Sequence, residues 1–293
     1  MDIIPFDQRD GYIWYNGEFV NWKDAKVHVL NHGLHYASCV FEGERIYGGK
    51  IFKCTDHSSR LHSSAEMLGF AVPYSVDQLD AAKKETAKKQ NIVDGYMRCF
   101  AWRGSEKMAI SAQGNKIHTA IACWPWPPYY SDEARKAGLK LSFARYKRPS
   151  PESAPTASKA AGLYMICTIS KHEAENAGYN DALMMDYRGY LAEATGANLF
   201  LVMKNGELHT PTPDCFLNGL TRQTVIDLAR EMGITVVERH IKPEELANAQ
   251  DAFLTGSAAE LTRIGSVADK YFYPEASKMT LDLMQAYHDL VRK

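Results

Sequence analysis

The sequence predicts an α+β protein built from two domains. The first 120 or so residues alternate hairpin patterns with two helix patterns and lack repeated strand–helix–strand units. A run of prolines and aromatic residues then interrupts the chain, and 293 residues are enough for two hydrophobic cores. We therefore predict a small α+β domain at 1–123, an interdomain loop at 124–131 and a large domain at 132–293.

Turn residues define the strands of the first half. Asn16-Gly17 supplies the left-handed residues of a tight turn and predicts a hairpin over Tyr12–Val20. Gly48-Gly49 predicts a second hairpin, from Cys39–Tyr47 to Lys50–Lys53. Alternating character predicts two further strands, Tyr96–Arg103 and Lys116–Trp124.

Capping residues define the two helices of this half. Asp56 is the expected N-cap of a helix that continues to Leu68 and stops at Gly69. Ser75 with Gln78 forms a capping-box pattern that opens a helix to about Gln90. We interpret the lysines of this second helix as a solvated face: Lys83, Lys84, Lys88 and Lys89.

The second half combines buried strands with amphipathic helices. The predicted helices are Ser131–Ala137, Gly162–Ala177, Arg222–Met232 and Ser277–Arg292. The predicted strands are Leu139–Tyr146, Asp181–Asp186, Leu199–Met203 and Asp251–Thr255.

Composition excludes several classes of protein. The net charge is −1 and no basic stripe is present, so nucleic-acid binding has no electrostatic support. The six cysteines are scattered without a C-x-x-C pair or a zinc-like Cys/His cluster, which indicates reduced thiols and no metal site. The first residues lack the pattern of a signal peptide, and no apolar run reaches bilayer length. We expect a cytoplasmic protein without membrane contact.

Lys159 is the candidate nucleophile. It lies among small residues, Pro155-Thr156-Ala157-Ser158-Lys159-Ala160-Ala161, just before a predicted helix. A lysine buried by small side chains loses its proton easily and becomes a nucleophilic amine. By local sequence alone a solvated surface lysine is the commoner case.

Three other charged positions admit two interpretations each. Glu193 lies among small and apolar residues, so it is either a buried carboxylate that needs a cationic partner or a strand end that faces water. Arg60 is either a surface residue or a phosphate ligand, and Tyr96 with Arg98 on one strand face is either a carboxylate site or an edge facing solvent.

Three loops have the character of ligand-binding segments. The stretch Trp124-Pro125-Trp126-Pro127-Pro128-Tyr129-Tyr130 is too apolar for a solvated linker, so it either packs at a ligand pocket or serves as a rigid spacer. Gly219-Leu220-Thr221 opens a helix whose N-terminus suits a phosphate, although threonine is also a routine N-cap. Ser257-Ala258-Ala259 follows a strand and exposes amide donors.

Together these motifs resemble the fold-type IV pyridoxal-phosphate (PLP) enzymes, and specifically the branched-chain amino acid aminotransferases. The resemblance extends from Gly33 to Glu260 and keeps the family's order and spacing. The segments that carry it are Phe41-Glu42-Gly43-Glu44-Arg45-Ile46-Tyr47, Arg60-Leu61, Tyr96-Met97-Arg98, Pro155–Lys159, Glu193 with Asn198-Leu199-Phe200, Gly219–Arg222 and the Ser257 turn.

The resemblance implies a role for each of these residues. Lys159 would hold PLP as an imine, Tyr164 would donate to the ring oxygen, and Glu193 would keep the pyridine nitrogen protonated. Leu217 would pack on the ring. The phosphate would be bound by Arg60, Leu220, Thr221 and Ser257.

The resemblance also implies a pocket that accepts both glutamate and aliphatic substrates. Arg98 with two tyrosines would bind the distal carboxylate of glutamate, and Tyr96 with the Ser257 turn would bind the α-carboxylate. The expected pocket residues are Tyr36 (across a homodimer interface), Phe41, Arg45, Tyr96, Arg98, Trp126, Tyr129, Ala258 and Ala259. The expected reaction is ping-pong transamination of leucine, isoleucine and valine with 2-oxoglutarate.

Two alternatives remain at this point. A D-amino acid or chiral amine transaminase, or a lyase acting on an aminated chorismate, would share the same fold and motifs. A non-catalytic scaffold built on this fold would need neither Lys159, Tyr164 nor Glu193, and their presence argues against it.

Overall fold

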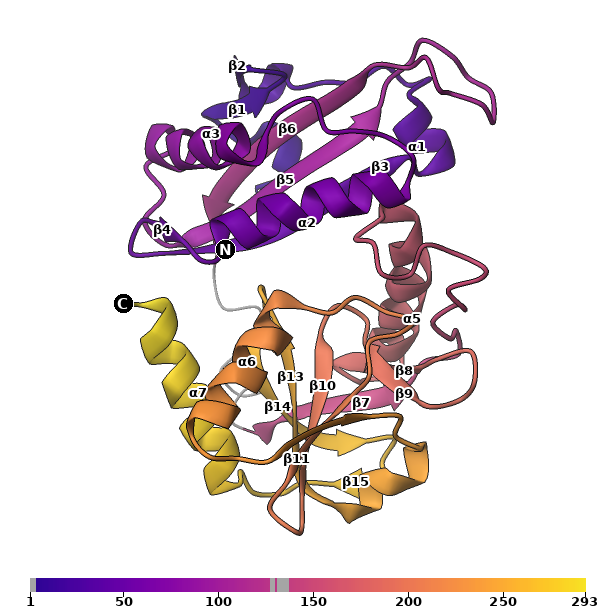
Figure 1. Ribbon diagram of the computed structural model, residues 1–293, viewed down its shortest axis with the longest axis vertical. Coiled ribbons are helices and arrows are strands. Elements are labelled where there is room, and N and C mark those ends of the chain that lie inside the picture. The colour runs from indigo at the N-terminus through magenta and orange to yellow at the C-terminus, as the bar shows by residue number, and fades with distance from the viewer. Residues whose placement is uncertain (1–3, 127–129, 131–136) are drawn as a thin grey trace. The chain divides into compact units, whose positions relative to one another are not determined.

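The chain folds into two compact units of mixed helix and strand content, which confirms the α+β class (Figure 1). The computed structural model describes residues 4–126, 130 and 137–293. One unit comprises Met1–Pro127 and Ser158–Gly162, and the other comprises Pro128–Ala157 and Leu163–Lys293. The segment that carries Lys159 therefore packs with the first unit. The predicted boundaries after residues 123 and 131 stay a prediction.

The first unit is built on an antiparallel sheet in the order β2-β1-β6-β5-β3-β4. Both predicted hairpins are present, with Asn16, Gly17, Gly48 and Gly49 at positive φ. The strands are β1 (Tyr12–Tyr15), β2 (Glu18–Asn21), β3 (Cys39–Tyr47), β4 (Lys50–Ile51), β5 (Gly95–Arg103) and β6 (Ile117–Pro125).

Two helices, α2 (Cys54–Met67) and α3 (Val76–Lys89), cover one face of this sheet (Figure 1). The core between them contains every second residue of the strands, such as Val40, Met97 and Ile121. The intervening residues of β3 and β5 face the other side of the sheet. The remaining helical elements of the described part of this unit are α1 (His32–Tyr36), η1 (Phe6–Gln8) and η2 (Trp22–Asp24).

Two predictions for these helices are wrong. α2 begins at Cys54, and the residue before it, Lys53, adopts a left-handed conformation (φ 51°). Asp56 therefore lies inside the first turn, where its negative charge still interacts favourably with the helix dipole. Lys83 is not solvated: it is fully buried and its Nζ lies 2.7 Å from Glu44 Oε1. The capping box is confirmed, since Gln78 N donates to Ser75 Oγ and Ser75 N donates to Gln78 Oε1.

The second unit contains a mixed sheet in which six strands close on themselves. Its path is β12-β11-β10-β13-β14-β7-β8-β9, and β9 also pairs with β10 through Glu193 and Asn198. The strands are β7 (Leu139–Phe143), β8 (Asp181–Met185), β9 (Leu191–Ala194), β10 (Asn198–Met203), β11 (Leu208–Pro211), β12 (Val236–Arg239), β13 (Ala249–Gly256), β14 (Glu260–Val267) and β15 (Tyr271–Phe272).

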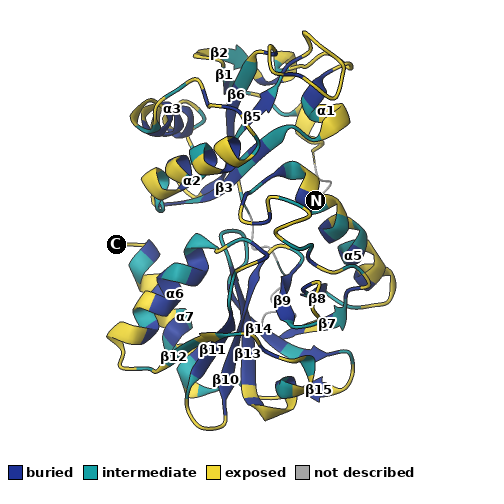
Figure 2. Ribbon diagram, turned by 45° about the vertical axis from the view of Figure 1, so that its right-hand side comes forward, coloured by how far each residue is buried: buried dark blue, intermediate teal, exposed yellow. Residues whose placement is uncertain are grey.

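Helices flank this closed sheet, whose strands β10 and β13 are buried almost throughout (Figure 2). The helices are α5 (Met165–Asn176), α6 (Leu220–Glu231) and α7 (Lys278–Val291), with shorter turns η3 (Ala161–Tyr164) and η4 (Pro243–Asn248). The strand predicted at Leu139–Tyr146 ends earlier, at Phe143, and the predicted Gly162–Ala177 helix begins as a 3-10 turn. The helix predicted at Ser131–Ala137 lies outside the described residues apart from Ala137.

None of the helices in the described ranges combines the length and the apolar composition needed to cross a bilayer.

Candidate active site

Lys159 is fixed to the first unit through its backbone. Its amide donates to Ser64 Oγ of α2 at 3.0 Å, and its carbonyl accepts from the Phe41 amide of β3 at 3.2 Å. Ala160 then forms an isolated bridge with Val40. The small residues around Lys159 let this segment lie directly along the start of β3, so these hydrogen bonds hold the backbone of Lys159 in place.

The Lys159 amine lies over an aromatic ring and among charged groups. Nζ is 5.0 Å from the centre of the Phe41 ring. Burial is the main cause that lowers the pKa of Lys159 to about 8, and the positive charges of Arg60 and Arg98 lower it further while Glu42 and Tyr96 oppose them. About a tenth of the amine is therefore unprotonated at pH 7, far more than in an ordinary lysine, and this is the form that a nucleophile or proton acceptor requires.

We expect Lys159 to react with amine-directed reagents at unusually low pH. An amine reacts only when unprotonated, so lowering its pKa moves the labelling midpoint down, to near pH 8, from about 10.4 for an ordinary lysine. Site-resolved mass spectrometry after brief labelling at graded pH measures this midpoint, with the exposed Lys84 as an internal reference. A midpoint for Lys159 above pH 10 would contradict the assignment.

Tyr96 and Arg98 lie together on the face of the sheet opposite α2 and α3. Arg98 Nη2 donates to Tyr96 Oη at 3.5 Å, and the Arg98 guanidinium lies 4.5 Å from the Phe41 ring centre. Trp126 stacks on Tyr96 with a centroid distance of 4.7 Å. These contacts join a cation, a phenol and apolar ring surfaces, which suits a carboxylate attached to an apolar body.

Gly43 makes room for the Tyr96 phenol. A Cβ at Gly43 would lie 1.8 Å from Tyr96 Oη, so only glycine allows the ring to occupy this position. Arg45 lies on the same strand as Gly43 and pairs with Tyr96 on β5. Its guanidinium lies 5.0 Å from the Tyr47 ring centre. Phe41, Arg45, Tyr96 and Arg98 thus share one sheet face, and strand alternation in the sequence predicted this for Tyr96 and Arg98.

Arg60 extends from α2 and is held by a buried carboxylate. Its Nε and Nη2 donate to the two oxygens of Glu42 at 2.8 and 2.7 Å, and His57 Nδ1 lies 2.6 Å from the same carboxylate. These contacts exclude the surface alternative for Arg60, and its role as a phosphate ligand stays a prediction. It is a partly buried arginine with one edge of its guanidinium fixed.

Glu193 is buried in the second unit, which excludes the water-facing alternative. Its Oε1 lies 3.4 Å from Nε of the buried Arg148, and its Oε2 accepts from Asn198 Nδ2 at 3.2 Å. Burial alone would lower the pKa of Arg148, but Glu193 and other anionic groups raise it above its usual value. The arginine therefore stays charged and supplies the cationic partner that a buried Glu193 needs.

Tyr164 lies next to this pair. It ends η3 and precedes α5, and its phenol contributes to the electrostatic environment of Arg148. Arg148 also donates to the Leu163 carbonyl at 3.4 Å and to Cys167 Sγ at 3.3 Å. Arg148 thereby links the start of α5 to the Glu193 hairpin.

The N-terminus of α6 forms an anion cradle. Its first turn contains Leu220 and Thr221, and its N-cap, Gly219, provides no side chain to satisfy the first amides. A Cβ at Gly219 would lie 2.3 Å from Asn198 Oδ1, so glycine is required there. Asn198 also donates to the Leu217 carbonyl at 3.0 Å and accepts from the Gly219 amide at 3.2 Å. One amide side chain thus joins the cradle to Glu193, and this arrangement fits a phosphate-bearing ring compound.

The Ser257-Ala258-Ala259 turn adjoins the same hairpin. Thr255, just before it, pairs with Asn198 across β13 and β10, and a Cβ at Gly256 would lie 3.3 Å from the Gly196 carbonyl. Thr262 Oγ1 donates to the Ala259 carbonyl at 2.7 Å and fixes the far end of the turn.

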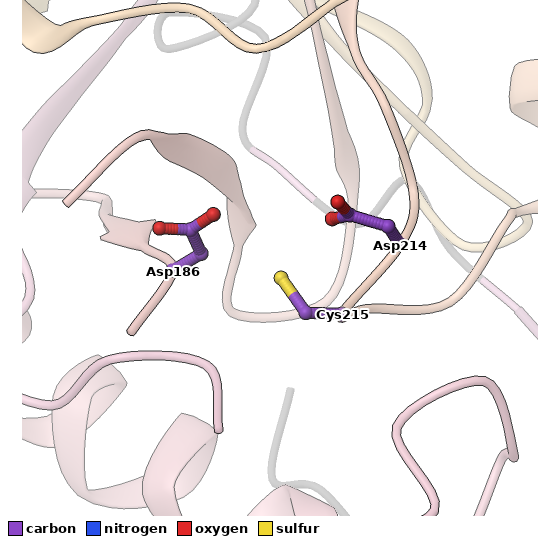
Figure 3. Close-up of side chains that lie close together, drawn as sticks. All are labelled: Asp186, Asp214 and Cys215. Carbon is purple, nitrogen blue, oxygen red and sulfur yellow. The ribbon is translucent and has the colours of Figure 1, made fainter. Parts of the chain in front are cut away.

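A separate cluster of Asp186, Asp214 and Cys215 lies in the second unit (Figure 3). Its carboxylates are already paired: Arg188 Nη2 lies 2.7 Å from Asp186 and 2.9 Å from Asp214, and His240 Nε2 lies 2.8 Å from Asp214. Burial raises the pKa of the Cys215 thiol to about 12. The cluster ties two loops together and carries no metal assignment.

Tyr36 and Tyr129 are the remaining predicted pocket residues. Tyr36 ends α1, where it stacks on His32 at 4.6 Å and is 43% exposed. Tyr129 lies outside the described residues. The sequence did not single out Arg148, Asn198, His57 or Glu42 for a role of their own. A buried Glu193 needs a cationic partner, and this need could have pointed to Arg148, which lies eleven residues before Lys159 in the sequence.

Known proteins resemble this chain in sequence and in fold. The sequence model of the family described as amino-transferase class IV matches residues 39–267. A branched-chain-amino-acid aminotransferase of Pseudomonas aeruginosa is 39% identical over 97% of this chain and 94% of that protein. The solved Escherichia coli branched-chain amino acid aminotransferase has a TM-score of 0.92 at 37% identity and covers 97% of this chain and 95% of its own.

A second solved structure adds a cofactor-bound form. The branched-chain amino acid aminotransferase of Thermobaculum terrenum in its PLP form has a TM-score of 0.87 at 28% identity, covering 97% of this chain and 95% of that one. The sequence-based expectation of family and fold is thereby confirmed. This chain belongs to the class IV aminotransferases.

Proposed function

We propose that this protein is a PLP-dependent aminotransferase that exchanges amino groups between branched-chain L-amino acids and 2-oxoglutarate. The observation that carries the proposal is the Lys159 amine, whose pKa is lowered to about 8 in the unit that also contains Arg98 and Tyr96. Relatives with this family's pattern are named for branched-chain substrates. A donor panel of L-leucine, D-alanine and a chiral aryl amine tests it, and preference for either of the last two would replace the substrate assignment.

The residues of the chain divide the work of holding the cofactor. When bound, PLP supplies an electron sink that stabilises the negative charge left at the substrate α-carbon. We assign Lys159 to the covalent attachment, Glu193 to the ring nitrogen, Tyr164 to the ring oxygen and Leu217 to the ring face. The phosphate is assigned to Arg60, the amides of Leu220 and Thr221, the Thr221 hydroxyl and Ser257. A cation and backbone amide donors are the groups that bind an anion, and this supports the assignment.

Proton movement is assigned to Lys159. With a pKa near 8 the Lys159 amine would take a proton from the substrate α-carbon without a large energetic penalty, and PLP, when bound, would supply the carbon that receives this proton. Its backbone is fixed by Ser64 and Phe41, so the side chain alone moves between the two positions. A second 2-oxo acid reverses the sequence, which gives ping-pong kinetics.

Arg98 is assigned to the distal carboxylate of glutamate. Its guanidinium already lies against the Phe41 ring and the Tyr96 phenol, so an aliphatic side chain can contact the rings while a carboxylate meets the cation. The α-carboxylate is assigned to Tyr96 and the amides of Ser257, Ala258 and Ala259. Arg45, Trp126, Tyr36 and Tyr129 complete the proposed pocket.

We expect Arg98→Ala to lower kcat/KM for glutamate by roughly 10- to 100-fold and that for leucine by less than about threefold. The estimate corresponds to the loss of one charge-assisted hydrogen-bonded contact of about 1.5–3 kcal/mol, which leucine does not make. Steady-state kinetics with each donor measure the ratio. Arg103→Ala is the control, because Arg103 lies on the same strand but donates to the Gly69 carbonyl at 2.7 Å. Equal losses for both donors in Arg98→Ala would refute the shared-pocket assignment.

A homodimer and a cytoplasmic location belong to the same proposal. The segment around α1 exposes apolar side chains that a second copy of the chain would cover: Val29 (70%), Leu30 (50%) and Leu34 (69%), with Tyr36 beside them. All six cysteines are free thiols, which suits a reducing compartment. Sedimentation of the purified protein tests the first point, and a monomer at micromolar concentration would contradict it.

A further inference from the structure

Glu42 is a fully buried carboxylate in the core of the first unit. It lies on the side of β3 that faces α2, among apolar residues such as Val40 and Cys99. A buried charge is costly unless every oxygen has a partner. Burial would raise the pKa of Glu42, but Arg60 and then His57 hold it well below its usual range, so the group is ionised.

The contacts of Glu42 fix the plane of one guanidinium. Oε1 accepts from Arg60 Nε at 2.8 Å, and Oε2 accepts from Arg60 Nη2 at 2.7 Å. Oε2 also lies 2.6 Å from His57 Nδ1, which prevents the carboxylate from rotating. Since Glu42 uses the Nε–Nη2 edge, the N–H groups that it leaves to an anion are those of Nη1 and the second one of Nη2. A two-point contact of this kind determines the direction of the guanidinium.

We propose that Glu42 is a positioning residue that holds Arg60 in the orientation in which it binds the cofactor phosphate. This inference rests on the proposed assignment of Arg60. Arginine otherwise populates many side-chain conformations, and fixing it before the phosphate arrives removes that cost from binding. The negative charge of Glu42 could have the opposite effect and weaken the attraction of Arg60 for phosphate, in which case removing that charge would lower the Kd for PLP. The two effects are therefore separable by experiment.

Glu44 provides a matched control within the same strand. It is also fully buried and lies on the same side of β3, two residues further on. Its partner is the buried Lys83 of α3 at 2.7 Å, and Lys83 in turn donates to Ser58 Oγ at 2.8 Å. Glu44→Gln thus removes a core carboxylate and breaks a buried ion pair, as Glu42→Gln does, without changing the direct contacts of Arg60.

The test compares two ligands that differ only in the phosphate. Apo-protein of the wild type, Glu42→Gln and Glu44→Gln is titrated with PLP and with pyridoxal, and thermal unfolding is followed in parallel. Glutamine offers one acceptor oxygen, so the two-point contact with Arg60 becomes a single one. We expect Glu42→Gln to raise the Kd for PLP about tenfold and to leave the Kd for pyridoxal within about twofold. Glu44→Gln should lower the melting temperature while both Kd values stay within about twofold.

Three results overturn the inference. If the Kd of Glu42→Gln for PLP equals that of the wild type or is lower, Glu42 has no positioning role. Equal weakening for PLP and pyridoxal shows general damage to the site. A Glu44→Gln variant with the same PLP-specific loss shows that any buried charge in this core has the effect. In each of these cases wild-type binding of PLP would leave the proposed function intact, whereas a wild type that binds PLP no better than pyridoxal would overturn both.

Two further variants keep the test decisive if Glu42→Gln does not fold. Glu42→Asp keeps the charge but withdraws the carboxylate by one methylene, and we expect a PLP-specific loss of the same sign. In an Arg60→Met background, either substitution at Glu42 should change the Kd for PLP by less than about twofold, because the residue through which it acts is gone. A full additional loss in that background would refute action through Arg60.

Discussion

Replacing Lys159 with alanine is expected to abolish multiple turnover, lowering kcat by at least about 10⁴-fold. The substitution removes both the attaching amine and the only proton carrier that the proposed mechanism uses, and such functions are worth several orders of magnitude in rate. The protein should still fold, because Lys159 is anchored through its backbone to Ser64 and Phe41. Steady-state kinetics with leucine and 2-oxoglutarate measure the loss, and circular dichroism verifies the fold.

Lys83, a buried lysine of the same unit, is the control for this substitution. Lys83→Ala breaks the ion pair with Glu44 and should destabilise the protein by about 3–5 kcal/mol, the usual cost of breaking a buried pair. Turnover by the folded fraction should persist. Wild-type multiple turnover in Lys159→Ala would remove the assignment, and loss of turnover in both variants at full folding would show that any buried lysine of this unit is essential.

Glu193→Gln is expected to lower kcat by roughly 10²-fold or more. The carboxylate is the group assigned to keep a proton on the cofactor ring nitrogen, and a neutral amide cannot do so. The change also leaves the charged Arg148 without its nearest counter-ion at 3.4 Å, so cofactor affinity should fall as well. Single-turnover kinetics at saturating PLP separate the chemical step from binding.

Glu238→Gln is the matched control in the second unit. Glu238 pairs with the buried Arg222 at 2.8 Å, so its substitution also removes the counter-ion of a buried guanidinium. It should lower stability and leave kcat within about twofold. An unchanged kcat in Glu193→Gln would show that proton retention on the ring does not depend on this carboxylate.

Local sequence patterns predicted much of the fold because the signals are short-range. The Asn16-Gly17 and Gly48-Gly49 turns and the Ser75–Gln78 capping box each depend on two to four neighbouring residues. The N-cap of α2 was predicted three residues late, at Asp56, because Lys53 adopts the left-handed conformation that glycine usually occupies. Strand β12 pairs with β11 in parallel across an intervening helix, and such a long-range contact leaves little trace in either segment.

The site residues were predicted from sequence motifs, but the residues that pair with them come from distant segments and are seen only in the structure. Strand alternation correctly placed Tyr96 and Arg98 on one face, since that requires only the pleat. The structure shows that the same pleat directs Glu42 and Glu44 toward the core, where isolated charges are unexpected. Their stabilisation depends on Arg60 and Lys83, which come from two different helices. The solvated-face interpretation of Lys83 failed for this reason.

Covalent trapping of the cofactor tests the central claim most directly. Purified protein is loaded with PLP and reduced with borohydride, and its peptides are mapped by mass spectrometry. We predict one phosphopyridoxyl group per chain, attached to Lys159. Attachment to another lysine such as Lys83, or recovery of no modified peptide, would contradict the account.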